Sequence, residues 1–590
     1  MSRVGLYANP ELARYRQGDS PVPPRHWLWP LYGAGLENLG VDDRPIQVDT
    51  PSCGPHQLLV RHDAVGLCFS DTKIIKAGNT HPRLAGRDMK ANPVVMGHEV
   101  VLTVLEVGED LAGRFERGDR FIVQADIRYK GVGLAYGYAL QGGLSQYNLI
   151  SEEILEGDEG CYLIRVKPDT GYAQAALTEP WACVVASYDI PYRTHWKSGG
   201  VTLIAAGRGA MPDHRLGSPY PEGQPPSRVV TMGVSGTLLD ELRRAAKADG
   251  FDLVQLGAPD EVSLSRAVAE SGQDGFDDIV FLGADPHLYE LLEPTANSGC
   301  VLNLVGEGAL SGSAQVDVGR LHYDGLSLVG TAQPVIGAAY KPIRTELRPG
   351  GCAAFIGAAG PMGQMHVQRA LQAKEGPRLI VATDLVPERL AVLETKLALL
   401  IQAKRGTTEL ICRTPDGRSP REFNASLVED TGGVGFDDIV VLAPSGRVVA
   451  ESVGMLARNG VMNIFAGLPR GTRVPIELSN LVTRGIRFTG SSGSGISDLR
   501  NMLDAAESGL LDPNLSVVAV AGLCGAKEGL EGIISRRFPG KCVIYPQILD
   551  FPVTMLEDLR DALPDVHAKL GPHHSWTNEA EAEFLRELLP

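Results

Sequence analysis

An internal repeat constrains the fold of this chain more than any other feature of its sequence. The hexapeptide GFDDIV occurs at 275–280 and again at 435–440, so the two occurrences are offset by 160 residues. Three further matches keep the same order along the chain: YRTHWKSGGVTLIAAG with IRTELRPGGCAAFIGAAG, NSGCVLNLVGE with RNGVMNIFAGL, and GLSLVGT with GIRFTGS. Chance does not produce four collinear matches, so the chain contains two copies of one α/β unit.

The second copy has the pattern of a dinucleotide-binding unit. An apolar run that starts at 352 leads into a loop with glycines at 357, 360 and 363, then into an amphipathic helix and a second apolar run that ends at Asp384. The spacing is GxxGxxG, and glycines let the backbone approach a pyrophosphate held at the N-terminus of the helix. Asp384 is placed to accept hydrogen bonds from a ribose, and no basic residue follows it directly, which favours NAD over NADP.

The first copy has lost this pattern. Behind its glycines, prolines stand at 212, 219, 221, 225 and 226, and the interior of a helix does not tolerate proline. Its second apolar run ends in MGVSG without an acidic residue. We interpret 191–339 as a degenerate copy that is kept for packing or for a subunit contact, with a second ligand site as the alternative.

Composition is typical of a globular protein and excludes several partners. Apolar residues make up 44% of the chain and charged residues 21%, as in ordinary soluble domains. The net charge of −16 argues against binding to nucleic acid or to an anionic membrane, because both need a basic surface. The sequence has no run of about eighteen apolar residues and no signal-peptide core, and its cysteines form no CxxC pair, so we expect a cytoplasmic protein with reduced thiols.

Residues of metal-ligand type stand in three short stretches before the repeat. GLCFSDTKIIKAG (66–78) contains Cys68, VVMGHEVV (94–101) contains His98 and Glu99, and LTEPWACVV contains Glu179. Thiolate, imidazole and carboxylate are all ligands that zinc accepts. Taken singly, each residue is equally consistent with a structural role, such as a buried thiol, a turn histidine or a solvated helix start.

Taken together, these stretches resemble the zinc-containing medium-chain dehydrogenase/reductase superfamily, in its polyol and sugar dehydrogenase branch. The resemblance is carried by GLCFSD, VVMGHEVV, VLEVGEDLAGRFERGDRFIV, EPWACVV, the glycine loop and GKCVIYP. It covers roughly 45–200 and 340–550, and it leaves out the first repeat copy and both ends of the chain. The stretch 121–150 is further similar to the L-sorbose 1-phosphate reductase group.

The resemblance implies one catalytic zinc ion and no structural zinc. By position, the residues that correspond to the catalytic zinc site are Cys68, His98, Glu99 and Glu179, and one of the two glutamates binds through water. The lobe after residue 99 contains no cysteine before Cys161. The four-cysteine structural site of many relatives is therefore not expected.

The resemblance also implies the catalytic and cofactor residues. Ser70 corresponds to the hydroxyl that relays the proton of the alcohol, Asp71 to the acid that orients the site, and Glu99 is counted with them. Lys73 stands where classical alcohol dehydrogenases often have a histidine, and it either shuttles the proton or holds a substrate phosphate. The residues that we assign to the cofactor are Gly357, Gly360, Pro361, Met362, Gly363, Asp384, Arg389, Gly467 and Ser491.

The implied fold is α/β: a GroES-like β-barrel catalytic domain and a Rossmann doubly wound parallel sheet, with a second, degenerate Rossmann-like copy. We expect an N-terminal extension at 1–45, the catalytic domain at 46–190, the degenerate copy at 191–339 and the NAD-binding domain at 340–495. The chain then returns to the catalytic domain at 496–550. An acidic C-terminal tail follows at 551–590, and we expect its charges to form a solvated face.

The expected function is that of a zinc- and NAD-dependent oxidoreductase. It would interconvert a secondary alcohol of a polyol, sugar or sugar phosphate with its ketone by hydride transfer to or from the nicotinamide. One alternative is a redox-neutral epimerase or lyase that keeps NAD and zinc bound, and another is a zinc-free quinone-type reductase. The expected partners are the small-molecule substrate and further copies of the chain in a homo-oligomer.

Overall fold

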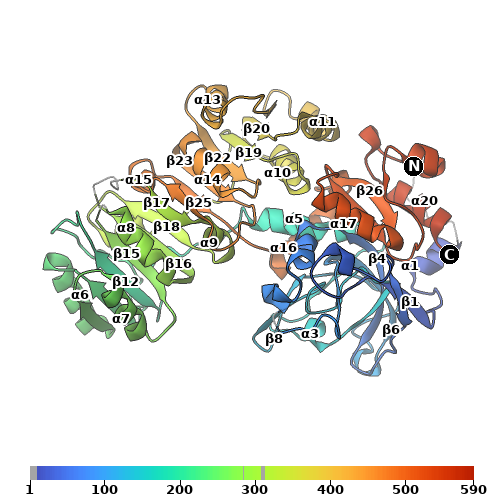
Figure 1. Cartoon of the computed structure of the whole chain (residues 1–590), viewed down its shortest axis with the longest axis horizontal. Coiled ribbons are helices and arrows are strands. Elements are labelled where there is room, and N and C mark those ends of the chain that lie inside the picture. Colours follow the sequence, from blue (N-terminus) through green and yellow to red (C-terminus); the bar gives the residue numbers. More distant parts are fainter. Residues whose placement is uncertain (1–9, 85, 284, 307–311) are drawn as a thin grey trace.

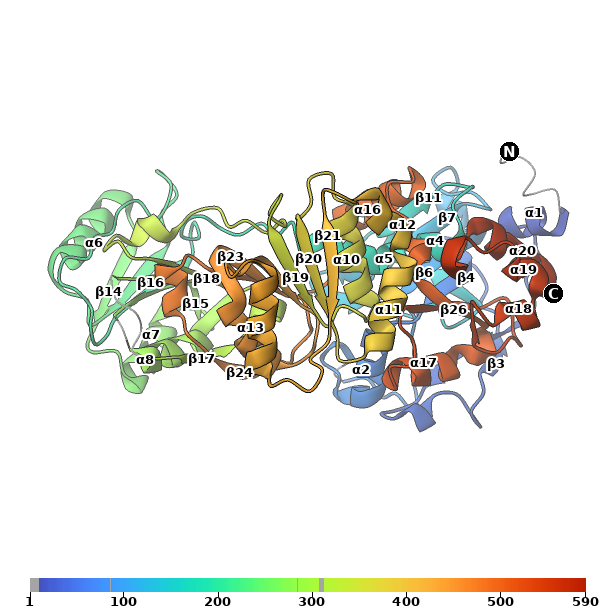
Figure 2. The same ribbon diagram turned by 90° about the horizontal axis from the view of Figure 1, so that it is seen from above.

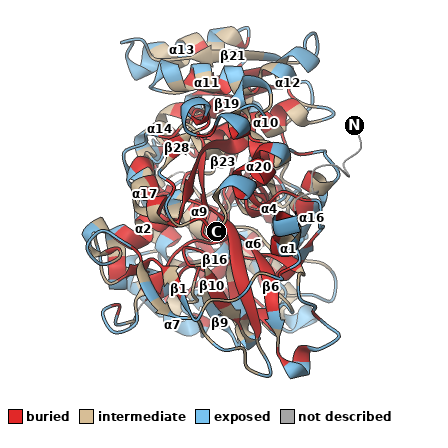
Figure 3. Cartoon of the chain, turned by 90° about the vertical axis from the view of Figure 1, so that its right-hand side faces the viewer, coloured by how far each residue is buried: buried red, intermediate tan, exposed pale blue. Residues whose placement is uncertain are grey.

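The computed structural model describes residues 10–590, except 85, 284 and 307–311. The first nine residues of the predicted extension and residue 307 of the repeated stretch NSGCVLNLVGE therefore lie outside the described part. The chain forms three bodies in a row, with the first repeat copy at one end, the second copy in the middle and the catalytic domain at the other end (Figures 1 and 2). Strands are largely buried, and exposed residues gather on outer helices and loops (Figure 3).

The domain that the sequence predicts to be catalytic, hereafter the catalytic domain, is built on one eight-stranded sheet. Its order is β11-β7-β6-β4-β27-β26-β28, and β10 pairs with β4 outside that path. The strands are β4 (Leu58–Gly66), β6 (Glu99–Val107), β7 (Arg120–Val123), β10 (Tyr147–Ile150), β11 (Leu163–Val166), β26 (Val517–Gly522), β27 (Lys541–Tyr545) and β28 (Thr554–Met555). The chain thus returns to this sheet after both repeat copies, and β27 pairs antiparallel with β4 in its centre.

The N-terminal segment packs on the catalytic domain. Strand β1 (Arg25–Leu28) pairs antiparallel with β3 (Ile46–Asp49), across the predicted boundary at 45. Trp29 is fully buried, and its Nε1 donates a hydrogen bond to the carbonyl of Leu523 at 2.7 Å. We therefore count 10–45 with the catalytic domain, because its buried apolar side chains belong to two cores that also contain strands of that domain.

The C-terminal tail also belongs to that domain, and the expectation of a solvated acidic face is wrong for part of it. Helix α20 (Asn578–Leu588) buries Glu581 completely. The Glu581 carboxylate accepts hydrogen bonds from the backbone N–H groups of Tyr172 and Ala173, at 2.6 and 2.7 Å, and from the Tyr545 hydroxyl at 2.8 Å. A buried carboxylate is stable only with such donors, which the acidic composition of the tail did not reveal.

Each repeat copy is a six-stranded parallel sheet, and the two have the same topology. The first has the order β14-β13-β12-β15-β16-β18 and the second β21-β20-β19-β22-β23-β25. The first consists of β12 (Val201–Ala206), β13 (Arg228–Met232), β14 (Asp252–Leu256), β15 (Phe276–Leu282), β16 (Ala296–Val305) and β18 (Ser327–Thr331). The second consists of β19 (Cys352–Ile356), β20 (Leu379–Thr383), β21 (Glu409–Arg413), β22 (Phe436–Val441), β23 (Leu456–Ile464) and β25 (Arg487–Thr489). The predicted duplication is confirmed.

Helices cover both faces of these sheets. In the first copy they are α6 (Gly236–Asp249), α7 (Glu261–Ser271), α8 (Pro286–Leu292) and α9 (Val318–Tyr323). In the second they are α10 (Pro361–Gln372), α11 (Pro387–Lys396), α12 (Ala398–Ala403), α13 (Pro420–Asp430), α14 (Gly446–Ser452) and α15 (Ser479–Thr483). The residues between β12 and β13 form no helix, as their prolines predicted. No described helix is both long enough and apolar enough to span a bilayer.

The repeated GFDDIV holds the same ion pair in both copies. In the first, Arg193 donates to Asp278 at 3.0 Å, and in the second, Arg344 donates to Asp438 at 2.5 Å. Asp278 and Asp438 are both buried. The second aspartate of each stretch is thus explained, because a buried carboxylate without its arginine would be strongly destabilising.

The two copies pair with each other through equivalent strands. Strand β17 (Ala314–Asp317) of the first copy pairs antiparallel with β24 (Arg473–Ile476) of the second, with Gln315 opposite Pro475. These two residues are 160 positions apart, which is the offset of the repeat. Equivalent residues that face each other define a local two-fold axis, as in an isologous dimer. The pairing thus reproduces, inside one chain, the symmetry of a contact between two subunits.

One apolar core lies between the copies. It contains Val316, Leu321 and Leu328 of the first copy together with Leu481 and Phe488 of the second. Helix α9 of the first copy lies against β23, β24 and β25 of the second. Two glycines allow this approach, since a Cβ at Gly319 would lie 2.2 Å from the carbonyl oxygen of Pro469, and one at Gly490 would lie 2.8 Å from that of Leu321. Backbone therefore meets backbone at this interface.

Candidate active site

Cys68, His98 and Glu99 meet at one end of strand β4. Their ligand atoms all lie within 4.8 Å of one another. The register of the sheet brings them together, because Gly66, the last residue of β4, pairs with Glu99, the first residue of β6. Cys68 follows two residues later as the N-cap of α2 (Phe69–Ala77). A Cβ on Gly66 would lie 2.2 Å from Glu99 Oε2, so glycine is required there.

Ser70 and Asp71 of α2 complete this group. The Ser70 hydroxyl donates to Cys68 Sγ at 3.0 Å and lies 3.2 Å from His98 Nε2. Asp71 Oδ2 accepts from the Cys68 backbone N–H at 3.0 Å, and its Oδ1 lies 3.3 Å from His98 Nδ1. Although burial lowers the pKa of His98, the Asp71 carboxylate raises that pKa well above its usual value. Asp71 thus orients both the thiol and the imidazole.

Lys541 is a partner of Glu99 that the sequence did not reveal. It begins β27, and its ammonium forms a salt bridge with Glu99 Oε1, with exposed side-chain fractions of 3% for Lys541 and 0% for Glu99. Burial by itself lowers the pKa of Lys541, but the nearby Glu99 carboxylate raises it above its usual value. The other carboxylate oxygen, Oε2, is buried without a hydrogen-bond partner among the described residues. The only signal in the sequence was a lysine at the start of the apolar run KCVIY.

Glu179 lies near this group but outside its 4.8 Å limit. It stands in the first turn of α5 (Thr178–Ala186), where Cys183 Sγ approaches its Oε1 to 3.8 Å. Removal from water raises the pKa of Glu179 to about 7, with His98 and Lys541 lowering it and Glu99 raising it. The structure therefore brings together three of the four predicted ligands and keeps the fourth within electrostatic reach.

The glycine loop joins β19 to α10. Gly357 has a φ of +85°, and a Cβ on Gly363 would lie 2.4 Å from the carbonyl oxygen of Ala358. A Cβ on Gly360, the N-cap of α10, would meet only Arg389 Nη2, at 3.9 Å. The space above Gly360 is therefore open. A pyrophosphate fits there because the N-terminus of this twelve-residue helix stabilises negative charge.

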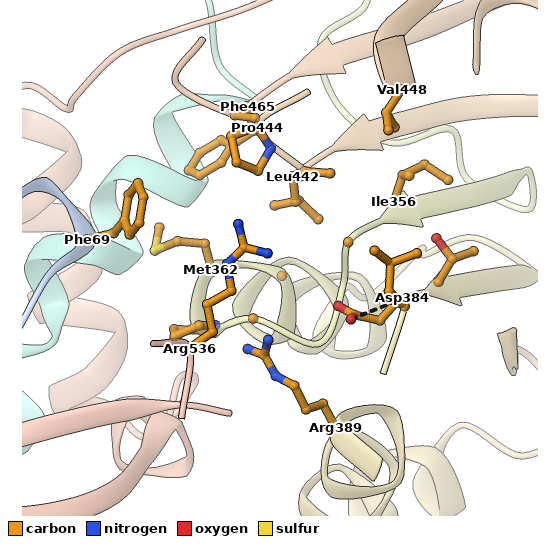
Figure 4. Close-up of a pocket in the computed structure, with 18 of the residues that line it drawn as sticks. Phe69, Ile356, Met362, Asp384, Arg389, Leu442, Pro444, Val448, Phe465 and Arg536 are labelled. Carbon is orange, nitrogen blue, oxygen red and sulfur yellow. Dashed lines mark hydrogen bonds between the residues drawn. The ribbon is translucent and has the colours of Figure 1, made fainter. Parts of the chain in front are cut away.

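Asp384 lies at the end of β20, beside the glycine loop. Its Oδ2 accepts from the Ala359 backbone N–H at 3.1 Å, and its Oδ1 accepts from those of Leu385 and Val386, at 2.8 and 3.2 Å. A carboxylate has about four acceptor positions, so capacity remains for a ribose hydroxyl. Arg389 lies near the glycine loop, below Asp384 in the view of Figure 4.

One cleft of about 660 Å³ joins the glycine loop to the catalytic domain. Figure 4 shows Asp384 and Ile356 toward one end and Phe69 of α2 at the other. Cys68, Lys73 and Lys541 line the catalytic end. Eight of the residues predicted to bind the cofactor also line it: Gly357, Gly360, Pro361, Met362, Gly363, Asp384, Arg389 and Gly467. Ser491, the ninth, is not among the lining residues.

Two residues close to the catalytic end come from parts that the sequence did not connect with it. The ring of Tyr138 lies 5.8 Å from that of His98. Tyr323, the last residue of α9 in the first repeat copy, accepts a hydrogen bond from Lys73 Nζ at 3.3 Å. Nothing in the sequence indicated that the degenerate copy reaches this far.

The chain resembles known proteins both in sequence and in fold. The family described as alcohol dehydrogenase GroES-like domain matches residues 54–156. Among solved structures, 2R,3R-butanediol dehydrogenase from Bacillus subtilis superposes with a TM-score of 0.50 at 16% identity, covering 88% of this chain and 99% of that one. This likeness concerns the fold.

Two curated relatives are similar in sequence. Mannitol-1-phosphate 5-dehydrogenase of Aliivibrio fischeri is 22% identical over 523 residues, which are 88% of this chain and 87% of the relative. L-sorbose 1-phosphate reductase of Klebsiella pneumoniae is 27% identical over 310 residues, which are 49% of this chain and 73% of the relative. The longer alignment extends into the first repeat copy, because an alignment that spans 88% of the chain cannot leave that copy out.

Proposed function

We propose that the chain is a member of the zinc-containing medium-chain dehydrogenase/reductase superfamily, and that it interconverts a secondary alcohol of a polyol or sugar phosphate with its ketone, using zinc and NAD. The observation that carries the proposal is the continuous cleft of about 660 Å³, because Cys68 and Lys73 line it together with the glycine loop. A substrate held at the catalytic end would therefore face a nicotinamide held over the second copy.

The donor set supports a zinc ion. Sulfur, imidazole nitrogen and carboxylate oxygen are the ligand types that zinc takes, and the partnerless, buried Oε2 of Glu99 is an acceptor in need of a cation. Cys68, His98 and Glu99 would hold the ion directly, and Glu179, outside the compact group, would act through water. When bound, zinc acts as a Lewis acid that favours loss of the alcohol proton, while NAD accepts the hydride.

The residues of the chain itself position the reactants and move the proton. Ser70 lies against both Cys68 Sγ and His98 Nε2, so its hydroxyl is placed to take the proton of an alcohol at this point. Asp71 holds the Cys68 backbone and faces His98, which fixes the direction of both side chains. Lys541 neutralises Glu99 at a point where both side chains are buried.

NAD is the cofactor that Asp384 favours. We expect the Asp384→Ser variant to bind NAD about tenfold more weakly, since it loses hydrogen bonds to a charged group, and to discriminate less against NADP. The reason is that the carboxylate accepts from ribose hydroxyls and repels a 2′-phosphate. Michaelis constants for both cofactors measure the effect. Glu388→Ser is the control, because Glu388 is exposed and does not line the cleft. If the ratio of the Michaelis constants for NAD and NADP were the same in the unmodified protein and both variants, the assignment of Asp384 would be contradicted.

The names of the two relatives suggest the substrates to test first. We expect NAD reduction with mannitol 1-phosphate, and NADH oxidation with L-sorbose 1-phosphate, by a sample that contains about one zinc per chain. Absorbance of NADH and metal analysis on the same preparation measure both. Absence of turnover with these and with unphosphorylated polyols, in a zinc-loaded sample, would refute the proposed reaction.

The two alternatives make different predictions in the same assay. A redox-neutral epimerase or lyase would convert substrate without net change in NADH, and a zinc-free reductase would keep its rate after chelation. The compact group of three zinc-type donors favours the zinc-dependent reaction over the latter. Homo-oligomerisation stays a prediction, and strands β17 and β24 are already paired with each other and so are not free for it.

A further inference from the structure

Helix α9 of the degenerate copy is fixed against the nucleotide-binding copy. His322 Nδ1 lies 3.1 Å from the carbonyl oxygen of Ile464, the last residue of β23. The backbone of α9 also meets Pro469 and Gly490 at distances that only glycine allows. The position of Tyr323, at the end of this helix, is therefore determined by the pairing of the two copies.

The orientation of the Tyr323 side chain is fixed by charged neighbours. The guanidinium of Arg470 lies 5.2 Å from the centre of its ring. Arg470 Nε in turn donates to Asp324 at 2.7 Å, and Asp324 also accepts from Arg320 at 2.6 Å. The ring is thus fixed by a charged network of its own copy and of the loop after β23, and its hydroxyl is directed toward Lys73.

Three separate parts of the chain converge on this hydroxyl. Lys73 comes from α2 of the catalytic domain, Tyr323 from the first copy, and Gly467 from the second. A Cβ on Gly467 would lie 2.8 Å from the Tyr323 oxygen and 2.9 Å from Lys73 Nζ. The absence of a side chain at 467 therefore keeps space beside both polar groups, at the catalytic end of the cleft that Gly467 and Lys73 line.

Unlike its charged neighbours, the Lys73 ammonium has no counter-ion among the described residues. Its neighbours are neutralised, since Arg83 pairs with Asp126 and Arg470 with Asp324. Within the described ranges, no carboxylate lies within salt-bridge distance of Lys73 Nζ. A half-buried ammonium beside a phenol that has a proton to donate is complementary to an anion with several acceptor oxygens.

The spacing between Lys73 and Ser70 on α2 would place this anion close to the reaction centre. Lys73 follows Ser70 by three residues on α2, so the two side chains lie on the same face, about 4.5 Å apart along the helix axis. The Ser70 hydroxyl contacts Cys68 Sγ, one of the three predicted zinc ligands that lie together. An anionic group bound at Lys73 would therefore sit close to the reacting carbon of the same substrate.

We propose that Lys73 and Tyr323 bind the phosphate of the substrate, so that the degenerate repeat copy supplies a specificity-determining residue to the active site. This inference rests on the proposed function and assigns its phosphate subsite. The degenerate copy then has a function beyond packing: its pairing with the nucleotide-binding copy brings a hydrogen-bond donor against Lys73, which lines the substrate end of the cleft.

The test compares Tyr323→Phe and Lys73→Met with matched controls in the full chain. The controls are Tyr129→Phe and Lys130→Met, since Lys130 lies 4.3 Å from the Tyr129 ring in a pair outside the cleft lining. Calorimetric titration with inorganic phosphate, with and without saturating NADH, measures the subsite without turnover. We expect about tenfold weaker phosphate binding in Tyr323→Phe, the size of one hydrogen bond to a charged group, and a larger loss in Lys73→Met.

Kinetics with mannitol 1-phosphate and with mannitol distinguish a failure of the proposed phosphate subsite from a failure of the proposed reaction. The expected result is a rise in KM for the phosphorylated substrate in both variants that is at least about tenfold larger than any change in KM for mannitol, with unchanged controls. An equal fall of kcat on both substrates would mean that Lys73 relays the proton, and it would overturn the proposal. Unaltered phosphate binding in both variants would also overturn it. Phosphate binding that depends on the two residues, without NAD reduction of any substrate, would instead refute the proposed reaction and keep the subsite.

Discussion

Cys68→Ser and His98→Ala proteins are expected to lose turnover by a factor on the order of 10³ or more, which corresponds to about 4 kcal/mol of lost transition-state stabilisation. Both residues belong to the group whose ligand atoms lie within 4.8 Å of one another, and loss of one donor from a three-residue set weakens metal binding. Zinc content per chain and initial rates, measured on the same samples, check the expectation. Circular dichroism verifies that the variants are folded.

The matched control is Cys53→Ser. Cys53 is another half-buried thiol of the catalytic domain, and its Sγ donates to the Gln57 carbonyl at 3.1 Å, a contact that a serine hydroxyl can keep. This variant is expected to retain both zinc and activity. A zinc-free Cys68→Ser protein that works at the original rate would show that the donor group has no part in catalysis.

The second large effect is expected for Lys541→Met. The variant leaves Glu99 fully buried without its counter-charge, and breaking a buried ion pair costs roughly 3–5 kcal/mol. Denaturant unfolding, with and without a chelator, measures the change. The loss should be largest in chelated protein, because a cation at the donor group would take over the neutralisation of Glu99. The Glu99→Gln/Lys541→Met double variant should regain stability, since no charge is then buried.

The control for this experiment applies the same substitution to an exposed pair. Lys130 lies 3.7 Å from Glu152, and both side chains are more than half exposed. Lys130→Met should leave the unfolding midpoint unchanged, because water screens such a pair. If Lys541→Met shifted the midpoint no further than Lys130→Met, the buried pair of Lys541 and Glu99 would stabilise the fold no more than the exposed pair does.

Local patterns identified the parts of the site that lie within one element. The glycine spacing and the following Asp384 located the loop between β19 and α10, and eight of the nine residues assigned to the cofactor line the cleft. The ninth, Ser491, does not line the cleft. Its position could not be predicted, because a serine after a strand carries no information on the direction that the following loop takes. Likewise, proline spacing was sufficient to exclude a helix after β12, since proline acts on its own backbone.

Contacts between distant segments were not predictable in the same way. Glu99 and Lys541 are separated by 442 positions, and Lys73 and Tyr323 by 250. No periodicity relates such residues, and a lysine in an apolar run is usually a solvated strand end. The burial of Glu581 is a similar case, because two of its three donors are backbone N–H groups some 400 residues away.

The sequence by itself determined that the chain contains two copies of one α/β unit, that only the second keeps a dinucleotide loop, and that zinc-type donors precede them. These features depend on short stretches, in which glycines, prolines and the spacing of apolar residues determine the local backbone conformation. Only the tertiary structure decided that β17 pairs with its own repeat equivalent β24, and that this symmetric contact carries Tyr323 to Lys73. The reason is that side chains from three separate elements converge only after the sheets have packed, and their common position depends on the register of strands far apart in the chain.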